Sequence, residues 1–248
     1  MIELGRIDMI TKVSLLSSFL ENPRRGHLEA VFRIFAYLDN NNNARMVFNP
    51  TYPEIEMSDF KTCDWKWFYG SAAEALPPDA PIPLGKEVDL RLYVDSDNSG
   101  DKSTSWSHTG YFIFLNSAPI VWFSKRQATV EASVFGAEFV ATKNGMEALR
   151  GLRYKLRMMG VPLSGPSFAY VDHMSVIHNT QRPESVLKNK SNSIFYHAYR
   201  EAVAMDEMIT GHVWSKKKPS DLATKLLGGS VNHNGLISNL FHDLTEFI

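Results

Sequence analysis

The order of strand-like and helix-like segments in the second half of the chain constrains the fold more than any other feature. Three β-branched, aromatic or otherwise apolar runs come first, at residues 88–94, 111–115 and 120–123, and they predict strands. A long segment rich in Ala, Glu, Leu, Lys and Arg follows at residues 129–159 and stops at Gly160, as expected of a helix. Three consecutive strands before a helix predict an antiparallel meander.

The remaining segments continue this alternation. Strands are predicted at residues 167–171 and 209–214, and helices at residues 174–180, 192–205 and 219–227. The predicted order is therefore β-β-β-α-β-α-α-β-α. Because strand–helix–strand steps favour parallel neighbours with helices on the faces of the sheet, we predict an α/β fold with a five-stranded mixed sheet flanked by helices.

A proline-rich stretch, ALPPDAPIPLGKE, separates this region from the first part of the chain. Its prolines favour extended backbone, so it is interpreted as a semi-rigid linker. Before it, an amphipathic stripe that includes Leu28, Val31 and Phe35 predicts a helix, and residues 45–48 predict a short strand. The predicted organisation is a small connecting segment at 1–74, a linker at 75–87, the main domain at 88–228 and a tail at 229–248.

Composition narrows the class of protein. With 44% hydrophobic and 21% charged residues the chain is expected to be globular, and its single cysteine, Cys63, excludes an internal disulfide framework. A net charge of −1 does not mark a polyanion-binding protein, so any basic surface has to be local. No apolar run reaches the roughly 20 residues of a membrane span, and no signal-peptide core is present. We expect an intracellular, cytoplasmic protein without a membrane partner, and its abrupt start suggests a piece of a longer chain.

Four acidic residues occupy positions from which they can converge. Asp95 and Asp172 are predicted to end the first and fourth strands, and they emerge at one edge if those strands are parallel neighbours. Glu138 lies within the long helix, and Asp221 lies in the first turn of the last helix, where an anion is favoured. Each acid alone has an ordinary explanation as a turn, cap or solvated helix residue, and only the four together indicate a functional site.

Converging carboxylates repel one another unless a cation neutralises them. Hard oxygen ligands suit Mg²⁺, with Mn²⁺ as the alternative. Two such ions about 3.5–4 Å apart would support an in-line displacement at phosphorus, with activation of water and stabilisation of the departing 3′-oxygen. The pattern predicts a nuclease that holds two ions when its substrate is bound, while Asp97 and Asp101 are interpreted as turn residues.

One long stretch resembles a known family. YVDSDNSGDKSTSWSHTGYFIFLNSAPIVWFSKRQATVEASVFGAEFVA is similar to the start of the ribonuclease H domain of copia-type LTR retrotransposon Pol polyproteins, which reads like D-A-D-W-A-G-D, S-T-S-G-Y, W-x-S-K-K-Q and S-S-T-E-A-E-Y. Asp172 falls at the family's D-N-x-S-A-I, and HVWSKKKPSDLATKLL resembles its H-V-x-T-x-x-Q-x-A-D-x-x-T-K. The resemblance implies a ribonuclease H-like fold and assigns catalysis and metal binding to the same four acids: Asp95, Glu138, Asp172 and Asp221.

The first part of the chain also resembles these polyproteins. GHLEAVFRIFAYLDNNNNARMVF is similar to the segment that follows the polymerase core in these polyproteins. The resemblance implies a C-terminal Pol fragment that acts on RNA–DNA hybrids, with the reverse transcriptase region of the same polyprotein as a partner and virus-like particles as a location. Two departures from the family pattern are Gly136, in place of the first glutamate of E-A-E, and His173, in place of an asparagine.

A nuclease acting on a hybrid needs basic side chains against the phosphates. A further basic run lies along the long helix, at Arg150, Arg153, Lys155 and Arg157. The candidates for nucleic-acid binding are Lys125, Arg126, Lys188, Lys190, Lys216, Lys217 and Lys218.

Three other functions are alternatives to hydrolysis of the RNA strand to 3′-hydroxyl and 5′-phosphate ends. A reverse transcriptase needs a YxDD turn, but LYVDSD and AYVDHM both lack the second adjacent acid, and only 94 residues precede Asp95. A transposase or integrase of related fold places its glutamate last, whereas here the glutamate is second. A catalytically weak or inactive retroelement remnant, which folds and binds nucleic acid or a partner protein without cleavage, remains the alternative.

Overall fold

The structure is a computed structural model of the 248-residue chain. It describes residues 2, 5–61, 63–98, 106–131, 133–187, 192–213, 218–226, 235–237 and 240–243.

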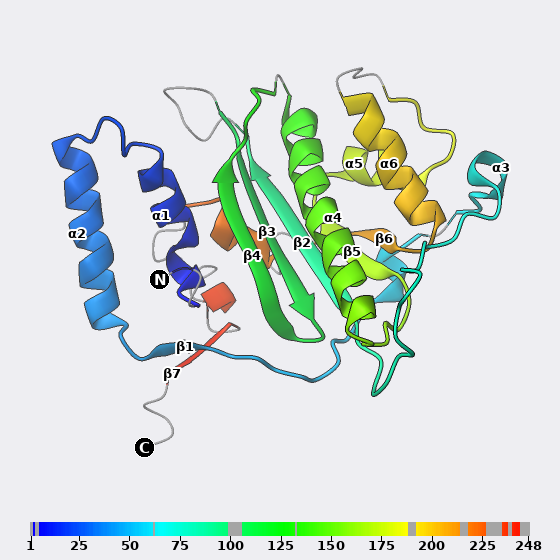
Figure 1. The fold of residues 1–248 in the computed structure, drawn as a ribbon. Helices are drawn as coiled ribbons and strands as arrows, with labels where there is room; N and C mark the ends of the chain where they lie inside the picture. The colour runs from blue at the N-terminus through cyan, green and yellow to red at the C-terminus, as the bar shows by residue number, and fades with distance from the viewer. Residues whose placement is uncertain are drawn as a thin grey trace.

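A five-stranded mixed sheet forms the centre of the molecule (Figure 1). Its strands are β2 (Leu90–Asp97), β3 (His108–Leu115), β4 (Ala118–Arg126), β5 (Ser167–Val171) and β6 (Met208–His212), in the spatial order β4-β3-β2-β5-β6. The first three strands are antiparallel neighbours, whereas β5 runs parallel to both β2 and β6. The predicted mixed sheet and its ribonuclease H-like order of elements are therefore confirmed.

Helices cover this sheet in the predicted sequence order. The helices that follow the meander are α4 (Val134–Met158), α5 (Met174–Gln181) and α6 (Ser193–Ala204), and a 3-10 turn, η6 (Pro219–Ala223), comes after β6. The first part of the chain forms η2 (Ile7–Met9), α1 (Ile10–Ser17), α2 (Arg25–Asn40), β1 (Ala44–Met46), η3 (Met57–Asp59) and α3 (Lys66–Tyr69), and β1 pairs with β7 (Phe241–Asp243).

Local sequence explains where the long helix α4 begins and ends. The Ser133 hydroxyl accepts a hydrogen bond from the Gly136 backbone N–H, which caps the first turn. At the other end Gly160 takes a positive φ of 70°, and the N–H groups of Gly160 and Val161 donate to the carbonyls of Arg157 and Leu156. These two bonds form a Schellman motif, for which a glycine is the preferred residue.

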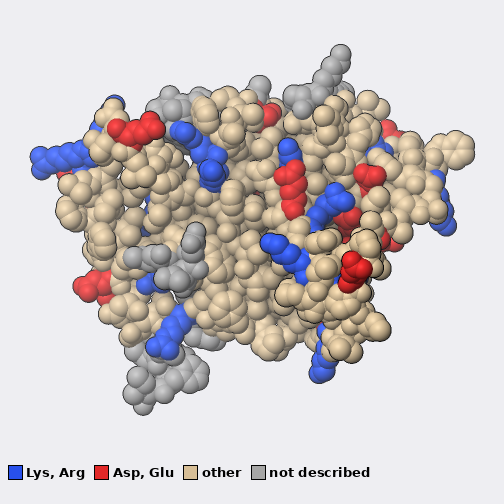
Figure 2. Space-filling view, in the orientation of Figure 1, with Lys and Arg blue, Asp and Glu red and all other residues tan. Residues whose placement is uncertain are grey.

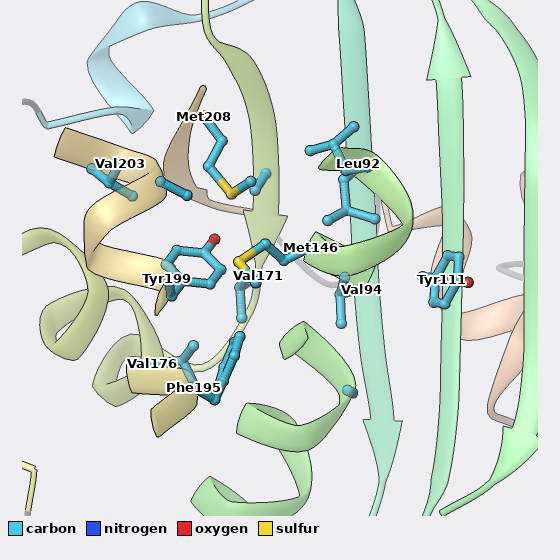
Figure 3. Close-up of a cluster of buried hydrophobic side chains, with 14 of the residues drawn as sticks. Leu92, Val94, Tyr111, Met146, Val171, Val176, Phe195, Tyr199, Val203 and Met208 are labelled. Atoms are coloured by element: carbon cyan, nitrogen blue, oxygen red, sulfur yellow. The ribbon is translucent and has the colours of Figure 1, made fainter. Parts of the chain in front are cut away.

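Alternation along β2 divides the core into two layers. Leu92 and Val94 face α4, where they pack with Met146, as the close-up in Figure 3 shows. Gly145 permits this approach, because a Cβ on it would meet Val94 Cγ2 at 2.8 Å. Tyr93 lies on the opposite face of the sheet and belongs to a second apolar cluster.

The first part of the chain covers that opposite face. Ile7, Ile10 and Phe60 pack there with Tyr93 and with Leu222 of η6. The Thr11 hydroxyl donates to the Leu222 carbonyl at 2.6 Å, which ties α1 to η6. Leu236 and Leu240 from the predicted tail join the same cluster. Segments on both sides of the predicted boundaries thus share one core, and the division of the chain into domains stays a prediction.

Several expected boundaries were wrong. Strand β2 continues past Asp95 to Asp97, because the whole of this stretch pairs with β3, and Asp97 lies opposite His108. The interpretation of Asp97 as a turn residue is therefore incorrect, while Asp101 lies outside the described residues. Pro219 begins a short 3-10 turn rather than an α-helix. Among the described residues, no helix has the combined length and apolar character needed to cross a membrane.

Candidate active site

Asp95 and Asp172 are placed together by the parallel pairing of β2 with β5. Tyr93 pairs with Tyr170, and each aspartate lies two residues further along its own strand direction. Asp95 is buried within β2, whereas Asp172 follows the end of β5 and is partly exposed. Both carboxylates therefore reach the same edge of the sheet, as the sequence predicted for parallel neighbours.

Glu138 joins them from α4. It is 4% exposed, its Oε1 accepts a hydrogen bond from the Ser96 backbone N–H at 3.4 Å, and its Oε2 is buried and has no hydrogen-bond partner among the described residues. One carboxylate oxygen each from Asp95, Glu138 and Asp172 lie within 4.8 Å of one another. Three acids from three separate elements thus form one compact cluster.

Asp221 approaches from the opposite face of the sheet, and Gly110 allows it to do so. Gly110 pairs with Asp95, and a Cβ on it would meet Thr224 Cγ2 at 2.6 Å and Ala223 Cβ at 2.7 Å. Because Gly110 has no side chain, η6 lies directly against β3, and the Thr224 hydroxyl donates a hydrogen bond to Asp95 Oδ2. Asp221 is buried beside this contact but is not among the three clustered acids.

Two lysines connect the three aspartates of the site. Lys218 is fully buried, and its Nζ donates to Asp95 Oδ1 and, at 2.6 Å, to Asp172 Oδ2. Its Nζ also lies 3.9 Å from Asp221 Oδ1. The Lys225 Nζ donates to Asp221 Oδ1 at 2.9 Å and lies 3.7 Å from Asp95 Oδ2. Each oxygen of the Asp95 carboxylate therefore faces one ammonium group.

Sequence reasoning missed the roles of both lysines. Lys218 was expected on a phosphate-binding surface with its neighbours, but it is buried inside the acidic cluster. The available signal was spacing, since Lys218 lies three residues before Asp221 and Lys225 four residues after it. Those spacings place charged side chains on one face of a helical turn.

Burial dominates the electrostatics of the site. It raises the pKa of the Glu138 carboxyl to about 8; Lys218 opposes this shift, and Asp95 and Asp172 add to it. Burial likewise raises the pKa of Asp221, with a further contribution from Asp95. Burial lowers the pKa of the Lys218 ammonium, but the surrounding carboxylates outweigh it, so the net direction is upward. The lysine is thus held in its charged form.

The donor set fits a hard divalent cation. Carboxylate oxygens are the ligands that Mg²⁺ and Mn²⁺ prefer, and Asp95, Glu138 and Asp172 present theirs at one place. The partnerless Glu138 Oε2 supplies an independent sign, because a buried carboxylate oxygen normally has a donor or a cation beside it. The Lys218 ammonium lies between two of these ligands.

The predicted nucleic-acid-binding residues have different surroundings. Lys125 and Arg126 are exposed near the end of β4, and the Arg126 guanidinium lies 4.4 Å from the centre of the Trp106 ring. On the face shown in Figure 2, basic side chains are scattered among acidic and uncharged ones. Four of the candidates lie outside the described residues: Lys188, Lys190, Lys216 and Lys217.

Most of the basic run along α4 is engaged within the protein. Arg153 is 2% exposed, and it donates to Glu74 Oε1 at 2.9 Å and Oε2 at 2.7 Å. Arg157 also pairs with Glu74, and Arg150 pairs with Glu207. These arginines support the packing of α4 and do not form a free basic surface.

Comparison with known proteins identifies relatives along most of the chain. No protein-family model matches it. It is 25% identical over 229 residues to the retrovirus-related Pol polyprotein from transposon RE1 of Arabidopsis thaliana, which covers 92% of this chain and 13% of that protein. It is 30% identical over 152 residues to the polyprotein from transposon RE2 of the same plant, and the match covers 60% of this chain and 10% of that protein. It is 26% identical over 223 residues to the polyprotein from transposon TNT 1-94 of Nicotiana tabacum, and the match covers 90% of this chain and 14% of that protein. The chain thus spans at most 14% of the length of these relatives.

Similar solved structures include LC11-RNase H1 in complex with an RNA/DNA hybrid, with a TM-score of 0.44 and 14% identity, covering 55% of this chain and 94% of that one. The N-terminal RNase H domain of a Mycobacterium tuberculosis protein has a TM-score of 0.40 and 12% identity, covering 56% and 91%. The ribonuclease H-like assignment rests on the strand order and directions of the chain itself. The predicted resemblance is confirmed: the relatives of this chain are retrovirus-related Pol polyproteins from transposons.

Proposed function

We propose that the chain is the ribonuclease H part of a transposon Pol polyprotein and hydrolyses the RNA strand of RNA–DNA hybrids, with Asp95, Glu138, Asp172 and Asp221 as its catalytic acids. The observation that carries the proposal is the meeting of acids from β2, α4 and the end of β5 within 4.8 Å, with Asp221 of η6 beside them. The similarity to Pol polyproteins from transposons supports the same proposal.

The roles of the four acids follow from their positions. A bound divalent cation, Mg²⁺ or Mn²⁺, would supply charge neutralisation and activation of water for cleavage at phosphorus. Asp95 is central, because its Oδ1 faces the side of Asp172 and its Oδ2 faces the side of Asp221. Glu138 adds a buried oxygen from α4. Asp95 would therefore contribute both on the side of Asp172 and on the side of Asp221. Binding of two ions together with substrate is the arrangement that would use all four acids.

The hybrid itself would need contacts beside this edge. Lys125 and Arg126 are exposed, and the stacking of Arg126 on Trp106 presents a cation next to an aromatic ring. Such a pair can engage a phosphate and a sugar or base. The reverse transcriptase region of the same polyprotein is the proposed partner for gripping the remainder of the duplex.

The test is cleavage of a labelled RNA–DNA hybrid by the purified 248-residue chain in Mg²⁺, with single-stranded RNA and duplex DNA as substrates that should remain intact. Asp95→Asn should abolish cleavage, because the central ligand loses its charge. Asp206→Asn is the matched control: Asp206 is exposed and has a φ of 57°, a conformation that asparagine tolerates, so activity should persist. Equal cleavage by the parent and Asp95→Asn proteins would refute the assignment.

One observation favours the alternative of a protein that binds without cleaving. The Lys218 ammonium already neutralises Asp95 and Asp172. Fluorescence anisotropy with the same hybrid separates the two functions, because binding without any cleavage in Mg²⁺ or Mn²⁺ would support the alternative.

A further inference from the structure

We propose that Lys218 is an internal counter-ion of the carboxylate cluster, and that its ammonium must leave the space between Asp95 and Asp172 before a divalent cation can bind there. This inference concerns the same acids as the proposed function and depends on it only for the placing of the cation. It predicts a property of metal binding that can be measured without any nucleic acid.

The contacts of Lys218 are those of a bound cation. Its side chain has no exposed surface, and its Nζ donates to Asp95 Oδ1 and to Asp172 Oδ2, with a third carboxylate, Asp221, at 3.9 Å. A fully buried lysine is rare unless its charge is paired. The cluster supplies that pairing, and the lysine in turn offsets the repulsion among the acids.

An ammonium and a divalent cation cannot occupy this place together. Mg²⁺ requires its oxygen ligands at about 2.0–2.1 Å, and two of the three carboxylates that would supply them, those of Asp95 and Asp172, already hold the Lys218 ammonium between them. Two cations in such close contact inside a buried cluster would repel strongly. Binding of the divalent cation therefore requires the lysine side chain to move out.

Glu138 shows what the ammonium leaves unsatisfied. Within the part of the chain that the structure describes, its Oε2 is buried and has no hydrogen-bond partner, although the glutamate lies in the same cluster as Asp95 and Asp172. A cation held between all three acids would engage Glu138, whereas the lysine engages only the two aspartates. Lys218 therefore pairs with only part of the cluster, and one carboxylate oxygen, Glu138 Oε2, remains available as a ligand for a metal ion.

Lys225 provides an internal comparison. It bridges Asp221 and the other oxygen of Asp95, but its side chain is 41% exposed. It can move into water with little change in burial, so it should oppose cation binding less than Lys218 does. A surface lysine of α4, Lys143, is 45% exposed, lies 3.9 Å from Glu147 and takes no part in the cluster.

The first experiment measures Mn²⁺ affinity by isothermal titration calorimetry on the whole chain without nucleic acid. Lys218→Met should bind Mn²⁺ with a Kd lower by about tenfold or more, because the competing charge is gone. Lys225→Met should change the Kd less, and Lys143→Met should leave it within about twofold of the parent value, as expected for a screened surface charge. An unchanged Kd for Lys218→Met would overturn the inference.

A second experiment uses the unaltered protein and so does not depend on whether a variant folds. Acetic anhydride acetylates accessible amines, and mass spectrometry of peptides reports each lysine. Lys218 should be protected in EDTA and should become labelled in saturating Mn²⁺, whereas Lys143 should be labelled equally in both. Protection of Lys218 that is the same with and without Mn²⁺ would contradict displacement.

These outcomes are separable from those of the proposed function. Tighter Mn²⁺ binding by Lys218→Met without hybrid cleavage by any protein would support the counter-ion and refute the nuclease. Cleavage by the parent, together with unchanged Mn²⁺ affinity in Lys218→Met and unchanged labelling of Lys218, would support the nuclease and refute the counter-ion.

Discussion

Gly110 lies directly opposite Asp95 across β2 and β3, and the space left by its missing side chain is filled by Thr224 and Ala223. This relationship brings η6, with Asp221, against the strand that carries the central acid. The candidate site therefore depends on a residue that has no functional group of its own.

Gly110→Ala should damage both the fold and the site. The added methyl would lie 2.6–2.9 Å from Thr224 and Ala223 atoms, including backbone, so η6 must shift at a cost of about 1–3 kcal/mol in the free energy of unfolding. Urea denaturation measures this cost. Gly151→Ala is the control, because a Cβ at this helical position would meet no described atom within 4 Å, and the variant should be more stable by up to about 1 kcal/mol.

Thr224→Val should weaken the support of Asp95. Valine keeps the shape of the side chain but removes the hydroxyl that donates to Asp95 Oδ2. We expect a loss of about 1–2 kcal/mol in unfolding free energy, measured by urea denaturation, since a buried carboxylate loses a donor. Thr224→Ser keeps the hydroxyl and should recover most of this hydrogen-bond contribution; equal losses in both variants would indicate that packing alone matters.

Glu74→Gln should destabilise the protein although Glu74 precedes the proline-rich linker. The Glu74 carboxylate accepts hydrogen bonds from Arg153, whose side chain is 3% exposed, and from Arg157. Replacing this carboxylate with a neutral amide leaves the buried Arg153 guanidinium without its counter-charge. Thermal or urea unfolding should show a loss of roughly 3 kcal/mol. Glu29→Gln breaks an exposed pair with Arg25 and should cost no more than about 0.5 kcal/mol. Similar small effects in both variants would mean that this ion pair does not hold the linker region to α4.

His108 should make the protein less stable in mild acid. Burial, helped by Arg126, lowers the pKa of its imidazole to about 4, and its Nε2 lies 2.9 Å from Ser124 Oγ. Because the folded pKa is below the ordinary 6.5, the unfolded chain binds the proton first, and stability is lost as pH falls from about 6.5 towards 4. The loss should amount to roughly 2–3 kcal/mol.

Urea denaturation at pH 7 and pH 5 tests this dependence. The parent protein should lose more stability between these two values than His108→Gln, which has no titrating group at this position. The same pH dependence in both proteins would assign the acid sensitivity to other groups.

The sequence alone determined the order of elements, because alternating apolar runs and a long helical segment carry the local signals of strands and helices. It also determined which acids could meet, since Asp95 and Asp172 follow strand patterns and Glu138 lies on a helix. The exact strand length was not determined, because pairing with β3, a contact distant in sequence, extends β2 to Asp97.

Only the tertiary structure decided the charge balance of the site and the cover of the second sheet face. The burial of Lys218 cannot be read from a run of lysines, because local sequence does not say which member of a run points inward. Likewise the apolar residues of the first segment, such as Ile7 and Phe60, find their partners on strands far along the chain. Such contacts arise when distant segments bury apolar surface together, which local patterns of strand and helix do not record.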